Sequence, residues 1–214
     1  MAKWIEETGF GWRLRKPVKE DGSIDWDAYS AVQNKGNHDK IGAVWATKGN
    51  IRFIAGMLLA ELRMPPKFGI CHGTRRGCEQ EWFEEALPGC EVVGTEIGES
   101  ATTFPRTVRW DFHDENPEWT GRADFVYSNA FDHSIDPRGA LETWRGQLRE
   151  GGAIFLEFGG GNIPANVSDL DPFGMIPEVI PWLMLKWGGL QVIGHSPLPE
   201  GPGTCCFIGR KSVE

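Results

Sequence analysis

The sequence has no excess of positive charge and no long apolar run. Its formal net charge is −8, which opposes the phosphate backbone whose neutralisation by Lys and Arg supplies most non-specific nucleic-acid affinity. No stretch approaches the roughly 18 apolar residues of a membrane span, and the first residues lack the apolar middle of a signal peptide. We therefore expect a cytoplasmic protein that binds neither nucleic acid nor membrane.

Cysteine is also scarce, and familiar cofactor fingerprints are missing. The five cysteines form an odd set, and Cys205 and Cys206 are adjacent, so a disulfide framework is not expected. Cys71, His72 and Cys78 lack a second matched pair at zinc-finger spacing, and the sequence predicts no metal site. The absence of Gly-x-Gly-x-x-Gly counts against a nicotinamide-dependent oxidoreductase.

From Lys67 onward, short apolar runs alternate with amphipathic helical patterns, which is typical of strands joined by crossover helices. The sequence predicts an α/β fold, with three layers around a doubly wound, mostly parallel seven-stranded sheet. The predicted strands are Lys67–Cys71, Cys90–Glu96, Thr107–Trp110, Ala123–Ser128, Gly152–Phe158, Leu190–Ile193 and Thr204–Arg210. The predicted helices are Asn50–Arg63, Glu79–Leu87, Pro137–Leu148 and Met175–Trp187.

We divide the chain into a core, 65–214, and an N-terminal extension, 1–64, whose helix packs on the core and which is a candidate substrate cap. The first forty or so residues and the segment 159–174 show no clear period and are expected to be loops. Long loops in compact domains are usually functional or mobile. Two interpretations of 159–174 therefore remain open: a lid over a substrate, or a plain surface excursion.

The segment from Phe68 to Gly77 is an apolar strand that runs into a turn with a glycine at each end. Glycine allows a sharp turn and close approach of a ligand, and free N–H groups at a helix start favour polar or anionic groups. Glu96 ends the next strand about 20 residues later, where a doubly wound fold presents an acid to ribose hydroxyls. We predict a nucleotide-like ligand here, the alternative for Glu96 being a solvent-facing side chain.

Two further strand ends carry polar residues. Asp111 and Phe112 follow the third strand. Asp111 can accept a hydrogen bond from the amine of an adenine, and Phe112 can flank its ring, although an Asp that caps a turn is the simpler interpretation. Asp132 and His133 follow the fourth strand, where an imidazole and a carboxylate can act as a general base. In the alternative, Asp132 caps the following helix and His133 only lines the pocket.

These motifs resemble the class I S-adenosylmethionine-dependent methyltransferases, from roughly Lys67 to Phe158 with a continuation to Arg210. The similar segments are the glycine loop Gly73–Gly77, the ribose acid Glu96, the adenine-side pair Asp111-Phe112, the run Asn129–Pro137, and Trp144–Gly152 with the strand Ala153–Glu157. The resemblance implies a sheet with a reversed last strand, S-adenosylmethionine at its carboxyl edge, and in-line methyl transfer. The predicted cofactor-binding residues are His72, Gly73, Thr74, Arg75, Gly77, Glu96, Ile97, Asp111, Phe112, Asn129 and Phe131.

The chain departs from the family pattern in the first loop, where Cys71 stands at the position of an acid and Arg75 replaces the middle glycine. In the family this acid helps to position the methionine amino group. The resemblance therefore requires another residue for that role, with His72, Asn129 and Glu157 as candidates, while Arg75 is a candidate partner of the methionine carboxylate.

The leading hypothesis is a methyltransferase that acts on an oxygen or nitrogen of a small molecule or sugar, with Asp132 and His133 as base or substrate contacts. The acidic charge and the lack of an appended nucleic-acid module favour a small acceptor. A catalytically silent, cofactor-binding partner subunit is the alternative, because of Cys71 and Arg75.

Overall fold

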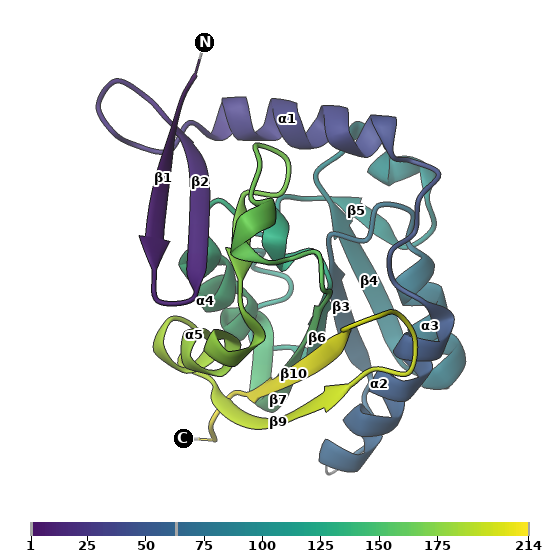
Figure 1. The fold of residues 1–214 in the computed structure, drawn as a ribbon. Helices are drawn as coiled ribbons and strands as arrows, with labels where there is room; N and C mark the ends of the chain where they lie inside the picture. The colour runs from purple at the N-terminus through teal and green to yellow at the C-terminus, as the bar shows by residue number, and fades with distance from the viewer. Residues whose placement is uncertain (1, 63, 214) are drawn as a thin grey trace.

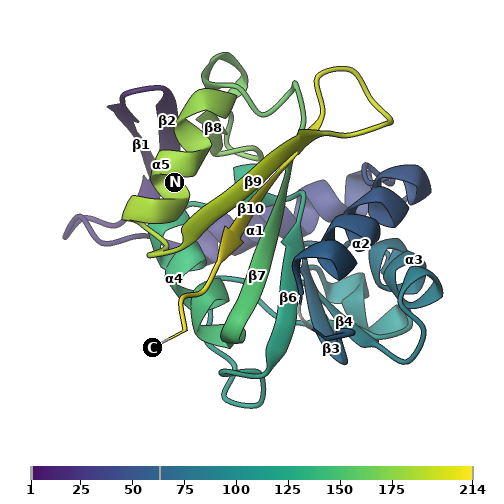
Figure 2. The ribbon, with the colours of Figure 1, turned by 90° about the horizontal axis from the view of Figure 1, so that it is seen from below.

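The computed structural model describes residues 2–62 and 64–213. Met1, Arg63 and Glu214 lie outside the described residues. The first residue of the predicted extension 1–64, the last residue of the predicted core 65–214 and the predicted end of the helix Asn50–Arg63 are therefore not described. A seven-stranded sheet with helices on both faces forms the centre (Figures 1 and 2), in the order β5-β4-β3-β6-β7-β10-β9. Its strands are β3 (Phe68–His72), β4 (Glu91–Glu96), β5 (Thr107–Arg109), β6 (Ala123–Ser128), β7 (Leu148–Phe158), β9 (Gln191–Pro197) and β10 (Cys205–Arg210).

Strand direction agrees with the prediction. The pairs from β5 through β7 are all parallel, and β10 is antiparallel to both β7 and β9. Every residue of β6 is buried, as expected for a strand covered on both faces. The prediction of a mostly parallel seven-stranded sheet with a reversed last strand is confirmed.

Two apolar clusters fill the space between the sheet and its helices. Trp144 of α4 and Leu183 of α5 belong to the cluster on one face. Ile54 of α2 and Phe83 of α3 belong to the cluster on the other. The helices are α1 (Trp26–Asp39), α2 (Lys48–Glu61), α3 (Cys78–Ala86), α4 (Pro137–Gln147) and α5 (Ile180–Lys186). Figure 1 shows α1 crossing the edge of the sheet instead of covering a face.

A second, three-stranded sheet was not predicted. The hairpin β1 (Lys3–Gly9) and β2 (Trp12–Val18) pairs with β8 (Phe173–Met175), so that the two segments expected to be loops are joined. The loop expectation is wrong for these strands and for α1. The helix Met175–Trp187 was also predicted too long: Phe173–Met175 is a strand, and the regular helix begins only at Ile180, after Pro177.

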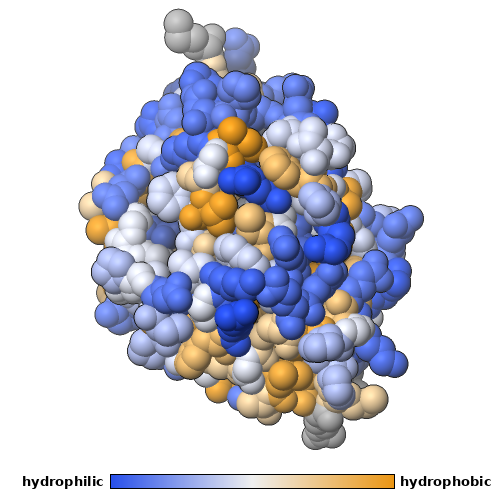
Figure 3. Space-filling view, turned by 90° about the vertical axis from the view of Figure 1, so that its right-hand side faces the viewer, coloured by the Kyte–Doolittle hydropathy of each residue, from blue (hydrophilic) through white to orange (hydrophobic). Residues whose placement is uncertain are grey.

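The surface on the right-hand side of Figure 1 is mainly hydrophilic, and its apolar side chains form separate small groups (Figure 3). Among the helices that the structure describes, none has both the length and the apolar character that crossing a membrane would require.

Candidate functional site

The turn after β3 is built as the glycine pattern predicts. The N–H groups of Gly73 and Thr74 both donate to the carbonyl of Thr95, at 2.9 and 3.0 Å. Gly73 has a φ of +74°, and a Cβ there would lie 2.4 Å from the Cβ of Ala130. A side chain is therefore excluded at Gly73 on both grounds, and the turn lies close against the segment after β6.

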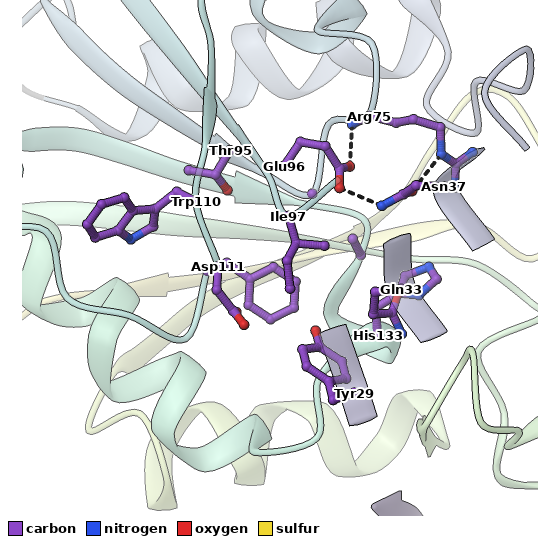
Figure 4. A pocket seen from close by; sticks show the side chains of 13 residues that line it. Tyr29, Gln33, Asn37, Arg75, Thr95, Glu96, Ile97, Trp110, Asp111 and His133 are labelled. Carbon is purple, nitrogen blue, oxygen red and sulfur yellow. Dashed lines mark hydrogen bonds between the residues drawn. The ribbon is translucent and has the colours of Figure 1, made fainter. Parts of the chain in front are cut away.

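The turn forms one wall of a pocket that we call the Glu96 pocket, which holds about 390 Å³ of empty space with its open mouth included. Figure 4 shows Glu96, at the end of β4, and Asp111, after β5, on one side of the pocket, with Tyr29 of α1 near them. Its lining from the core comprises Gly73, Arg75, Thr95, Glu96, Ile97, Trp110, Asp111, Phe112, Ala130 and His133. Six of the predicted cofactor residues thus meet in one pocket: Gly73, Arg75, Glu96, Ile97, Asp111 and Phe112.

Glu96 is 4% exposed, and its carboxylate uses three of its roughly four acceptor positions within the protein. It accepts hydrogen bonds from the backbone N–H of Arg75 at 3.0 Å, from that of Gly98 at 2.8 Å, and from the side-chain amide of Asn37 (Figure 4). Burial raises the pKa of Glu96, whereas the Gly98 N–H and the charge of Arg75 lower it. Glu96 is thus a buried acceptor at the end of β4 and does not face solvent.

Asp111 is oriented by His113. Its Oδ1 accepts from the His113 N–H at 3.0 Å and lies 2.6 Å from His113 Nδ1, while His113 Nε2 lies 2.7 Å from the hydroxyl of Ser134. Phe112 packs against His113 with ring centroids 4.6 Å apart. Asp111 therefore does cap its own turn, and it also lines the Glu96 pocket.

Helix α1 supplies three pocket residues that the sequence did not predict: Tyr29, Gln33 and Asn37. The helix begins where Asp25 accepts from the N–H of Ala28, and Tyr29 and Gln33 lie on its buried face. An N-cap Asp before residues at helical spacing is a signal that could have predicted this helix. Which face of the core it covers is a tertiary contact that the spacing does not encode.

Arg75 holds the segment after α1 in place. Its guanidinium donates to Asn37 Oδ1 at 3.0 Å and to the carbonyls of Lys40 and Ala43 at 3.4 and 3.2 Å. Arg75 also has a φ of +47°, which is unusual for a residue with a side chain. The residue that replaces the family glycine thus anchors the polypeptide that covers the turn.

A larger pocket lies beside the Glu96 pocket, and we call it the Asp132 pocket. It holds about 1180 Å³ of empty space with its mouth included. Its walls come from the segment after β6 and from residues 159–174, with Lys40 and Trp45 from the α1–α2 connection. Residues 159–174 are therefore a wall of a pocket; whether they act as a lid stays a prediction.

His133 lies in a short 3-10 turn (Phe131–His133) at the junction of the pockets. Its Nδ1 is 2.9 Å from the carbonyl oxygen of Leu170, and its Nε2 is 3.8 Å from Asp171 Oδ1. Because a carbonyl only accepts, Nδ1 carries a proton. In the neutral ring the lone pair is then on Nε2, the nitrogen nearest Asp171.

Asp132 has no hydrogen-bond partner for its Oδ1, which is fully buried among the described residues. Burial raises the pKa of this carboxyl, and the neighbouring Asp171 raises it further while His133 lowers it. The cap of α4 is Asp136, which accepts from the N–H of Gly139 at 3.0 Å. The alternative in which Asp132 caps that helix is therefore wrong.

Asp132, His133 and Asp171 also form a compact group, with one ligand atom from each within 4.8 Å of the others. These are side-chain types that coordinate divalent cations. The expectation of no metal site consequently stays a prediction.

A third pocket, with about 350 Å³ of empty space including its mouth, adjoins the other two, and we call it the bridging pocket. It shares Gly73, Arg75 and Ala130 with the Glu96 pocket and Trp45 and Asn129 with the Asp132 pocket, and His133 lines all three. Thr74 and Glu79 lie in its wall as well. Two more predicted cofactor residues, Thr74 and Asn129, are thus placed in the connected site.

Three predicted cofactor residues line none of these pockets: His72, Gly77 and Phe131. The ring nitrogens of His72 lie 2.9 Å from Thr95 Oγ1 and 2.8 Å from Gln147 Oε1, and burial lowers its pKa to about 4. Phe131 packs in the core, and Gly77 begins α3. The side chain of His72 has no free polar atom for a ligand, so we leave these three residues out of the proposed cofactor set.

Comparison with known proteins shows the fold. No protein-family model matches the chain, and no curated protein sequence does. Among solved structures, it is similar to the 1,6-didemethyltoxoflavin-N1-methyltransferase of Burkholderia thailandensis with bound S-adenosylhomocysteine (15% identity, 99% of this chain, 100% of that chain, TM-score 0.67). It is also similar to a putative methyltransferase in complex with the Haloferax volcanii Trm112 activator (17%, 88% and 98%, 0.61).

The [4+2]-cyclase SpnF is also similar, at a lower TM-score (11% identity, 88% of this chain, 94% of that chain, TM-score 0.57). The chain therefore has the fold of the class I S-adenosylmethionine-dependent methyltransferases, as the motifs imply. Since one fold carries different chemistries, the activity must be argued from the site.

Proposed function

We propose that this chain is an S-adenosylmethionine-dependent methyltransferase that acts on an oxygen or nitrogen of a small molecule or sugar. The observation that carries the proposal is the junction at His133, where a pocket with polar nucleoside partners meets a larger pocket in which Asp132 Oδ1 has no hydrogen-bond partner among the described residues. A group-transfer enzyme needs two adjoining sites of this kind, because proximity and alignment supply much of its rate.

The residues of the Glu96 pocket fit S-adenosylmethionine. Glu96 offers a buried carboxylate for ribose hydroxyls, and Asp111, Phe112 and Ile97 offer an acceptor and apolar surface for the adenine. Gly73 lines the pocket without a side chain, so a ligand can approach the backbone of the turn closely. When bound, the cofactor supplies a methyl group on a positively charged sulfur.

His133 and Asp132 act on the acceptor. Nε2 of His133 takes the proton of a hydroxyl or amine, while the Leu170 carbonyl fixes the ring and its tautomer. The carboxylates of Asp132 and Asp171 accept hydrogen bonds from the acceptor and stabilise the imidazolium that forms. Polar acceptors with several donor groups, such as sugars and amines, suit such a lining.

A silent cofactor-binding subunit is the second candidate, and the contacts of Arg75 and Asn37 favour it. The Arg75 guanidinium holds the Asn37 side chain, and the Asn37 amide takes one acceptor position on the carboxylate that a ribose would use. In that role the chain would bind cofactor and act through a protein partner; a Trm112 activator is the partner in one similar structure.

Two measurements test the proposal in sequence. Calorimetry with S-adenosylhomocysteine is expected to show binding to the wild-type chain, with NAD as a comparator that does not compete. Methyl transfer from labelled S-adenosylmethionine is then measured across panels of hydroxyl and amine acceptors. Failure of the first step would refute the cofactor assignment, and binding without any methylated product would favour the silent subunit.

A further inference from the structure

The site lacks a negative charge where the family places one. Cys71, at that position, is fully buried, and burial raises the pKa of its thiol well above its ordinary value, so it stays neutral. Of the replacements that the sequence suggested, His72 has both ring nitrogens engaged. Glu157 accepts at both oxygens, from the Tyr127 hydroxyl at 2.7 Å and the Asn50 amide at 3.2 Å.

Glu79 is a carboxylate without these commitments. It lies in the first turn of α3, is 4% exposed, and lines the bridging pocket with Thr74 and Asn129. Its Oε2 is fully buried and has no hydrogen-bond partner among the described residues. A buried acceptor left without a partner costs free energy, which a ligand with a cationic donor in the pocket would recover.

We propose that Glu79 binds the ammonium group of the methionine part of S-adenosylmethionine, in place of the acid that Cys71 replaces. The proposal rests on the function proposed above. Glu79 and Cys71 lie on the same side of the sheet, since Cys71 packs in the cluster under α2 and α3. The acid has thus moved from the end of the strand to the first turn of the following helix, and Asn129 offers a second, uncharged acceptor in the same pocket.

The protonation of Glu79 agrees with this role. The pKa of Glu79 is raised to about 8, mainly by burial and also by the charges of Glu157 and Glu96, against a backbone hydrogen bond and the charge of Arg75, which lower it. A carboxyl that is neutral in the free protein avoids the cost of a buried charge, and an ammonium group beside it favours the ionised form. The bound ligand would therefore supply the cation that the free protein lacks.

The test compares two ligands that differ in the group Glu79 is proposed to bind. S-adenosylhomocysteine carries the amino acid part, and 5′-methylthioadenosine keeps only the nucleoside thioether. Calorimetry on Glu79→Gln is expected to show S-adenosylhomocysteine binding weakened by about 10- to 100-fold, the loss of one charge-assisted hydrogen bond. Binding of 5′-methylthioadenosine should be unchanged. Glu81→Gln, an exposed glutamate of the same helix, is the matched control and should leave both affinities unchanged.

Equal weakening of both ligands would overturn the proposal, because it would mean that Glu79 only supports the turn. Unchanged binding of S-adenosylhomocysteine would overturn it as well. If Glu79→Gln does not fold, Glu79→Asp keeps the charge on a shorter side chain and should weaken S-adenosylhomocysteine selectively by a smaller factor. A wild-type chain that binds neither ligand would instead refute the proposed function.

Discussion

The Glu96 pocket and the Asp132 pocket lie side by side but are built in opposite ways. In the first, Glu96 accepts from three protein donors and Asp111 is fixed by His113. In the second, which has about three times the empty volume, Asp132 Oδ1 has no partner and His133 Nε2 faces a carboxylate. Hydrogen-bonded groups fix the shape of the Glu96 pocket before a ligand binds. An unpaired buried group, as in the Asp132 pocket, gains its hydrogen bond only when a ligand binds.

The largest effect on activity is expected from a substitution in the Asp132 pocket. His133→Gln removes the proposed base, and methyl transfer should fall by about 10²- to 10⁴-fold, whereas calorimetric affinity for S-adenosylhomocysteine should change little. His38→Gln, at an exposed histidine, is the control. Wild-type turnover in His133→Gln would show that the residue only lines the pocket.

A substitution in the Glu96 pocket should change the affinity for the cofactor product instead of the turnover rate. Glu96→Gln keeps the size of the side chain and removes its charge, so the affinity for S-adenosylhomocysteine should weaken by about 10- to 100-fold. Glu99→Gln, at a side chain that is 83% exposed, is the matched control. An unchanged dissociation constant for Glu96→Gln would mean that Glu96 serves only to hold Asn37 and the turn.

Glu79, which lines the bridging pocket, should make the stability of the fold depend on pH. The pKa of Glu79 is about 8 in the folded chain and 4.5 ordinarily, so between these values unfolding releases a proton and stability falls as pH rises. The slope is at most about 1.4 kcal/mol per pH unit. Denaturant unfolding of Glu79→Gln between pH 5 and 8 should show a flatter profile than wild type. Parallel profiles would assign the dependence to other groups.

The smallest effect is expected for α1, the helix that covers the Glu96 pocket. Asn37→Ala removes the α1 contacts to Glu96 and Arg75, each worth about 1 kcal/mol, so backbone amides of α1 should exchange hydrogen several-fold faster. Lys35→Ala, at a side chain of the same helix that is 78% exposed and pairs with Asp39 of that helix, is the control. Equal protection in Asn37→Ala and wild type would mean that α1 is held by packing alone.

The parts of the site that were predictable are those fixed by strand ends. Apolar runs determine where β4 and β5 stop, and Glu96 and Asp111 then reach the same edge because parallel strands end together. Asp171 and Asn37 were missed because they arrive through a loop and a helix whose positions depend on long-range contacts. The cofactor role of His72 stays a prediction: both faces of β3 are buried, and the sequence does not reveal that Thr95 and Gln147 will pair with its ring nitrogens.

The same distinction applies to the fold. Seven strands were found from local apolar runs, whereas the hairpin β1–β2 gains its third strand from residues more than a hundred positions away. Glu79 was read only as part of an amphipathic helix, because nothing in a helical period reveals that one carboxylate oxygen will lack a partner.

The carbonyl of Leu170 accepts from Gln33 of α1 at 2.8 Å and from Nδ1 of His133 at 2.9 Å. Gln33 lines the Glu96 pocket, and His133 carries the proposed base of the Asp132 pocket. The Leu170 carbonyl oxygen therefore links α1, which covers the Glu96 pocket, to His133, the proposed base of the Asp132 pocket. A shift of α1 that admits a nucleoside would pass through this carbonyl to the imidazole, and any coupling between the two ligands would be equal in both directions.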